Sequence, residues 1–260
     1  MKKLFCVALL MMLAMAPSAA EAYWLDISAG YWSPEPSGGV SYTPAGQFTT
    51  NPSIELDNDL NFEKEGMAQI RAKIDLPLIN FALMYTPMEF EGTNTLTRDI
   101  TFGSDTFPAT EQITSKFSMD HTDIALFWGL PFLQTATAGM LNVELGLNAR
   151  LLDFEASVKS SADPANTALN ESRSVSATIP MIYLGAQVMP TDSFTIEAEY
   201  RGISAGDNKF TDIMAMVKYK PIPLLYISAG YRAENLELDK EGILSDIEFK
   251  GPFAELGLKF

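Results

Sequence analysis

One histidine and a set of acidic residues are the side chains of this sequence with the most obvious capacity for chemistry. His121 is the only histidine, and it lies in the run Asp120-His121-Thr122-Asp123. A histidine positioned by a carboxylate is a common general base in hydrolysis. Asp57 and Asp59, two residues apart, offer a second acidic pair. A hydrolytic site with His121 as base is therefore one hypothesis. No serine is set up as a partner, so no catalytic residue is assigned, and the simpler interpretation makes His121 part of a charge network.

The acidic run between residues 55 and 65 is a second candidate. It contains Glu55, Asp57, Asp59, Glu63 and Glu65. Carboxylate oxygens are the ligands that Ca²⁺ prefers, but the run lacks the glycine and the spacing of a defined calcium loop. We therefore expect a solvated loop here, and the sequence predicts neither a metal site nor a cofactor.

The other charged residues follow a period of two. Between Leu141 and Leu151 every second residue is apolar, and Glu144 and Arg150 occupy intervening positions. This alternation is typical of a strand with one apolar face and one polar face. Extended to ten such segments, it places eight acidic and eight basic residues on the polar faces, a predicted lumen charge network: Asp26, Asp75, Asp123, Glu144, Glu197, Glu199, Asp212, Glu255, Arg71, Lys73, Arg150, Arg201, Lys218, Lys220, Arg232 and Lys259.

The length of the alternating segments indicates where the chain resides. Several alternate for ten or more residues, close to the ~9–11 that a tilted membrane strand needs and above the average of about five or six in soluble proteins. A soluble β-sandwich also alternates, but its solvated face carries Ser and Thr rather than full charges. We predict an all-β, transmembrane, antiparallel up-and-down β-barrel of about ten strands, with eight or twelve as alternatives.

The first residues have the pattern of an export signal. Lys2 and Lys3 precede the apolar stretch 4–15, and Ala20-Glu21-Ala22 fits a cleavage site, so we expect a signal peptide over 1–22 and a barrel over 23–260. Cleavage would change the net charge from −15 to −15 − 2 + 1 = −16. The only cysteine, Cys6, would be removed, leaving no disulfide. Such an acidic chain, without a basic run, is not expected to bind nucleic acid.

The connections between the expected strands alternate in length. Short turns contain proline, whereas the polar stretches 34–59 and 92–115 are long. This alternation predicts extracellular long loops, with both termini in the periplasm. Pro87 and Pro180 fall inside expected strands. The apolar positions shift by one residue after each of them, so we predict a β-bulge at both.

The chain ends on an aromatic residue after an alternating strand. Phe260, Leu258 and Leu256 are the expected assembly signal. With the signal peptide, the proline-marked turns and the stretch 54–60, this ending resembles a family of small bacterial outer-membrane β-barrel proteins. The resemblance implies a Gram-negative outer membrane, contact with its lipid and lipopolysaccharide, and assembly by the barrel-assembly machinery. It assigns no reaction and leaves the oligomeric state open.

Three functions remain in view. The first is a structural or interaction role with long external loops. The second is a porin-like narrow channel for small solutes. However, balanced charge inside a ten-stranded barrel favours a paired network over an open pore. The third is an outer-membrane hydrolase. Some ten-stranded outer-membrane barrels are proteases with acidic residues and a histidine near the outer rim, but they place an Asp two residues before the His, where this sequence has Met119.

Overall fold

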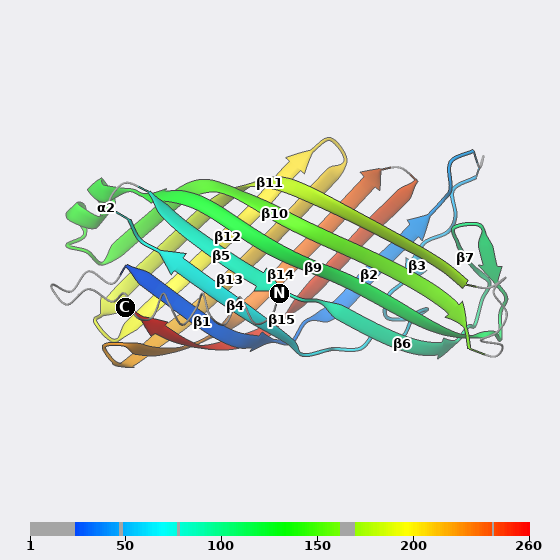
Figure 1. Ribbon diagram of the computed structural model, residues 1–260, viewed down its shortest axis with the longest axis horizontal. Helices are drawn as coiled ribbons and strands as arrows, with labels where there is room; N and C mark the ends of the chain where they lie inside the picture. Colours follow the sequence, from blue (N-terminus) through cyan, green and yellow to red (C-terminus); the bar gives the residue numbers. More distant parts are fainter. Residues whose placement is uncertain (1–23, 47–48, 77–78, 162–169, 241) are drawn as a thin grey trace, which may run out of the picture.

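A computed structural model describes residues 24–46, 49–76, 79–161, 170–240 and 242–260. The predicted signal peptide lies outside the described residues. The chain forms a closed antiparallel barrel of ten strands (Figure 1). Seven strands are continuous: β9 (Gln112–Gly129), β10 (Leu141–Ser160), β11 (Asn170–Thr191), β12 (Phe194–Ala205), β13 (Asn208–Ile222), β14 (Leu225–Lys240) and β15 (Ile243–Lys259).

The remaining three strands of the barrel are β4 and two interrupted strands. β1 (Leu25–Trp32) and β2 (Glu35–Tyr42) both pair with β15, and β5 (Asn80–Thr86) and β6 (Glu89–Thr95) both pair with β9. β4 (Met67–Ile74) lies between β1 and β5. The barrel closes where β1 meets β15, with Asp26 opposite Lys259. No backbone edge is then left open at this seam, as a lipid environment requires.

The two ends of the barrel differ. One end carries the start of β1, the C-terminus and the short helix α2 (Pro131–Ala136); we call it the terminal end (Figure 1). The other carries the hairpin of β7 (Ile100–Phe102) and β8 (Asp105–Phe107); we call it the loop end. Within the described residues, no helix is long and apolar enough to cross a membrane.

In the terminal half of the barrel the apolar face points outward. On β10, Leu145 and Leu147 are 50% and 65% exposed, whereas Glu144 before them and Arg150 after them are buried. The predicted alternation is therefore confirmed here, and its apolar side forms an outer belt that faces lipid.

In the loop half the chemistry of the two faces is reversed. Further along β10, Asp153 and Glu155 point outward and are exposed, while Leu152 and Val158 are buried inside. The strand has 20 residues, so it extends about 66 Å at ~3.3 Å per residue, or roughly 47 Å along the barrel axis at a tilt of ~45°. The apolar belt of such barrels is only ~25 Å tall. The loop half therefore projects beyond the membrane and has an apolar core of its own.

Aromatic side chains fill this loop-half core. Phe90 of β6 and Phe249 of β15 stack with their ring centroids 5.5 Å apart. The ring of Phe117 on β9 packs edge-on against Phe154 at 5.2 Å. Leu56 and other residues from outside the ten barrel strands complete the cluster. The core thus closes the inside of the barrel at the loop end.

The segment 54–66 closes the wall where β4 is absent. β4 starts at Met67, opposite Trp32, so it does not reach β2. There β3 (Ile54–Glu55) pairs with β2, and the Asn94 side chain of β6 donates to the backbone oxygens of Asn58 and Asp59, both at 3.0 Å. On its β6 side, this part of the wall is held by side-chain hydrogen bonds rather than by a strand ladder.

The bulges predicted at the two prolines are wrong. The β9 register is the same on both sides of Pro87, since Thr86 pairs with His121 and Glu89 with Ser118. The ladder is interrupted, but no residue is inserted. Met88 and Phe90 seemed to mark a shifted apolar face because both are apolar; they point inward, into the loop-half core.

Pairing of β10 with β11 runs without a break through Pro180, which lies opposite Ala149. Pairing of β11 with β12 extends only to Ile182 opposite Gly202. On that side Pro180 is at a free edge, where its missing N–H costs no ladder hydrogen bond.

Two predicted boundaries also need correction. The expected loop 34–59 contains β2 and β3, and the expected loop 92–115 contains the end of β6, the hairpin β7–β8 and the start of β9. The two stretches were assigned to loops because EPSGGVSY and its neighbours lack the apolar alternation of the membrane strands.

Candidate functional site

A cluster of charged side chains fills the middle of the barrel. Arg150 of β10 contacts Asp123 of β9 at 2.7 Å, Asp212 of β13 at 2.6 Å and Glu234 of β14 at 2.6 Å. Arg232 of β14 contacts the same Asp212 and Glu234, each at 2.9 Å. All five side chains are buried. We call them, together with His121 and Arg201, the ionic cluster.

Some of these contacts join opposite walls. β9 and β14 are five strand positions apart in the ten-stranded barrel, and His121 of β9 lies 3.1 Å from Arg232 and 3.2 Å from Glu234 of β14. β4 and β12 are also five positions apart, and Arg71 of β4 contacts Glu199 of β12 at 2.5 Å. Side chains therefore span the full width of the lumen at this level.

His121 is enclosed by the cluster. Its Nδ1 lies 3.0 Å from the carbonyl oxygen of Met119. Since a carbonyl oxygen can only accept, Nδ1 carries a hydrogen and donates it. The residue is 1% exposed, so it lies in no open cleft of the kind that the hydrolase hypothesis needs. Asp57 and Asp59 lie elsewhere, in the segment 54–66, where Asp59 pairs with Arg98.

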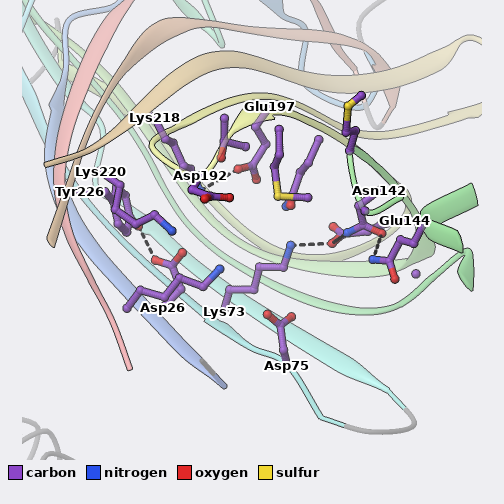
Figure 2. A pocket seen from close by; sticks show the side chains of 18 of the residues that line it. Asp26, Lys73, Asp75, Asn142, Glu144, Asp192, Glu197, Lys218, Lys220 and Tyr226 are labelled. Carbon is purple, nitrogen blue, oxygen red and sulfur yellow. Dashed lines mark hydrogen bonds and ion pairs between the residues drawn. The ribbon is translucent and has the colours of Figure 1, made fainter. Parts of the chain in front are cut away.

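A cavity of about 1360 Å³ opens at the terminal end, between that end of the barrel and the ionic cluster. Figure 2 shows charged side chains around it. Lys73 contacts Glu144 at 2.7 Å, and Lys218 contacts Glu197 at 2.7 Å. The hydroxyl of Tyr226 donates to Asp26. The cavity is thus polar, and most of the charges around it are paired with one another.

The structure places every residue of the predicted lumen network inside the barrel, in two groups. Six lie in or beside the ionic cluster: Asp123, Arg150, Glu199, Arg201, Asp212 and Arg232. Eight line the cavity: Asp26, Lys73, Asp75, Glu144, Glu197, Lys218, Lys220 and Lys259. Arg71 and Glu255 join the two groups, 3.4 Å apart.

The sequence analysis missed one member of the ionic cluster, Glu234, and two hydrogen-bond partners of Arg232. Glu234 is fully buried between Arg150 and Arg232, and it could have been found by continuing the inward alternation of β14 two residues past Arg232. Gln69 and Thr86, which accept hydrogen bonds from Arg232 at 3.4 and 2.9 Å, are uncharged and gave no comparable signal.

The acidic run 55–65 and the C-terminus can also be placed. No group of three or more His, Cys, Asp or Glu among the described residues is arranged to hold a metal ion. At the other end of the chain, Leu256 and Leu258 face outward on β15, 56% and 41% exposed, and the carbonyl of Phe260 accepts a hydrogen bond from the N–H of Leu25 at 3.1 Å. Their role as an assembly signal stays a prediction.

Comparison with known proteins defines the class of fold. No protein-family model and no curated protein sequence matches the chain. Among solved structures, the outer-membrane protease OmpT from Escherichia coli aligns with a TM-score of 0.52 and 12% identity, over 90% of this chain and 97% of that one. At this identity the likeness concerns the fold alone. The chain has the fold of bacterial outer-membrane β-barrels.

Two further barrels give weaker alignments. The translocator domain of the autotransporter NalP from Neisseria meningitidis aligns with a TM-score of 0.44 and 12% identity, over 100% of this chain and 96% of that one. The attachment invasion locus protein Ail of Yersinia pestis aligns with a TM-score of 0.37 and 13% identity, over 91% and 97%. The predicted fold class, a transmembrane antiparallel barrel of about ten strands, is confirmed.

Proposed function

We propose that this chain is an integral outer-membrane β-barrel with a closed lumen, which serves a structural or interaction role through its loop end. The observation that carries the proposal is the double closure of the lumen. The ionic cluster spans the barrel at mid-height, with Arg150 and Arg232 at 0% exposure, and the loop-half aromatic core lies beyond it. A solute entering the cavity at the terminal end would meet both layers.

The surroundings follow from the same proposal. The outer belt would contact outer-membrane lipid. The loop half, whose outer surface is polar, would contact lipopolysaccharide. Both termini would face the periplasm, where the barrel-assembly machinery would meet the C-terminal strand. Cysteine labelling of intact cells tests this orientation. A membrane-impermeant maleimide should label the variant Thr106→Cys at the loop end and not Asp192→Cys at the terminal end, and the reverse result would place the loop end inside.

Planar-bilayer conductance tests the closed lumen. Refolded protein, shown to be assembled by its heat-modifiable migration on gels, should give no stepwise conductance. Steady steps would overturn the closed lumen and favour the narrow channel, for which the terminal-end cavity would be the entrance.

A variant separates the two layers of the closure. Arg71→Ala removes a contact across the lumen to Glu199 but leaves the aromatic core intact. It should remain non-conducting. Conductance in this variant, but not in the parent, would show that the charged contacts across the lumen close the barrel and that the aromatic core does not.

A further inference from the structure

The connection between β9 and β10 continues the apolar outer belt past the end of the barrel. Residues 130–140, which include α2, contain no charged side chain. Phe132 is 65% exposed, and the outward residues on the adjoining strands, Trp128 and Leu145, are also exposed and apolar. Met140, at the end of the connection, lines the cavity instead. The apolar surface is thus continuous from the two strands onto the helix, which lies at the terminal end in Figure 1.

Polar side chains in this connection form hydrogen bonds with other groups of the connection or with a residue on its lumen side. The Thr135 hydroxyl donates to the carbonyl of Pro131 at 3.0 Å, and the Thr137 hydroxyl donates to the carbonyl of Leu133 at 2.7 Å. The Gln134 side chain donates to Asn142 at 2.9 Å, and both residues line the cavity. Internal pairing of this kind is what a polypeptide needs where water is absent.

Another turn at the same end offers a contrast. The β11–β12 connection consists of Asp192 and Ser193, and these two residues and the last residue of β11, Thr191, are all exposed and polar. A turn in water has no reason to be apolar, so the difference between the two connections indicates different surroundings. α2 also has distinct sides, because Gln134 faces the cavity and Phe132 is largely exposed.

We propose that the connection 130–140 is inserted into the bilayer interface, with Phe132 in contact with lipid acyl chains. Its partner is the membrane itself. The continuity with the lipid-facing belt, the absence of charge and the internal pairing of polar groups all fit this occupant. The belt is then taller on the β9–β10 side than on the β11–β12 side, and the connection anchors the barrel at that side.

Spin-label accessibility tests the proposal on the refolded mature chain in phosphatidylcholine bilayers. The variants Phe132→Cys, Leu147→Cys and Asp192→Cys each receive one nitroxide, since no native cysteine follows Cys6. Oxygen partitions into lipid, whereas a nickel chelate stays in water. The label at position 132 should be relaxed mainly by oxygen, like the lipid-facing control at 147, and the label at 192 mainly by nickel.

Two results would overturn the inference. Relaxation of the label at 132 mainly by nickel, as at 192, would place the helix in water. Protection from both reagents would show that protein, not lipid, covers it. Heat-modifiable migration confirms that each variant is assembled.

Discussion

The two halves of β10 differ in what they bury, although one alternation runs through both. On the terminal side of Leu151, Leu147 faces out and Arg150 faces in; on the loop side, Asp153 faces out and Val158 faces in. Each half buries the type of side chain, charged or apolar, that its surroundings solvate poorly. In lipid, charged groups must be inside and paired, whereas in water the usual preference for an apolar interior returns.

The two interiors are therefore held by different forces. In the ionic cluster, removing one partner leaves other charges buried without compensation, so single substitutions are expensive. In the loop-half core, stability comes from packing, and the cost of a substitution follows the volume removed. The predictions below test this contrast, in order of expected effect.

The largest effect is expected in the ionic cluster. Arg150→Ala removes the one cation that contacts Asp123, Asp212 and Glu234 together, although Asp212 and Glu234 keep Arg232. We expect the free energy of unfolding to fall by about 3–5 kcal/mol. Urea unfolding in lipid vesicles, followed by tryptophan fluorescence, measures it. A loss no greater than that of an exposed ion pair would show that the cluster is hydrated rather than dry.

An apolar pair on β15 tests the packing of the loop half. Ile247 is buried in the loop-half core, whereas Leu256 faces lipid. Ile247→Ala should cost about 3 kcal/mol, because a cavity remains. Leu256→Ala should cost about 1.5 kcal/mol from transfer alone, since lipid fills the space. The same urea titration compares them. Equal losses would contradict a close-packed core.

A smaller effect is expected in the segment 54–66. Asn94→Ala removes two hydrogen bonds to the backbone of Asn58 and Asp59, which should cost about 1–2 kcal/mol. Hydrogen exchange should accelerate in residues 54–66 before the barrel strands. Asn58→Ala is the matched control, because that side chain bonds only its neighbour Asp57. Unchanged exchange in the Asn94 variant would mean that backbone pairing, not the amide, holds this wall.

The smallest effect is expected on the outer surface of the loop half. Lys116 pairs with Glu91 at 2.8 Å, both largely exposed. The hydrogen bond to Glu91 raises the pKa of Lys116, so its small stabilisation is present at neutral pH and lost as the pH rises through the folded-state pKa. Lys116→Gln should leave the unfolding midpoint unchanged at physiological salt. A clear shift would show that this surface is less hydrated than its position implies.

The sequence predicted which residues share a face, but not what each face meets. Period-two alternation assigned Arg150, Arg201 and Arg232 to the inward face, and the three side chains are buried. The same rule gave the wrong result at Pro87, because apolar Met88 and Phe90 were assumed to face lipid. The alternation of apolar and polar residues does not indicate the height along the barrel axis at which a strand leaves the membrane. That height depends on the tilt and length of neighbouring strands, which become known only once the barrel is built.

Other features had no usable signal. β2 contains glycine and proline rather than alternating apolar residues, and its place is set by pairing with the far end of β15. The position of His121 opposite β14 depends on closure of the whole barrel. Contacts across a lumen join residues that are distant in sequence, so local patterns cannot reveal them.

The contacts across the lumen also have a kinetic consequence. Arg71 and Glu199 are 128 residues apart in the chain, and Gln69 and Arg232 are 163 apart. Neither pair can form until strands from both halves of the chain have met, so the charges must lose their water together, in one late step. Closure of this barrel should therefore be slow and all-or-none, with β1 docking on β15 as the event that commits the chain to its final state.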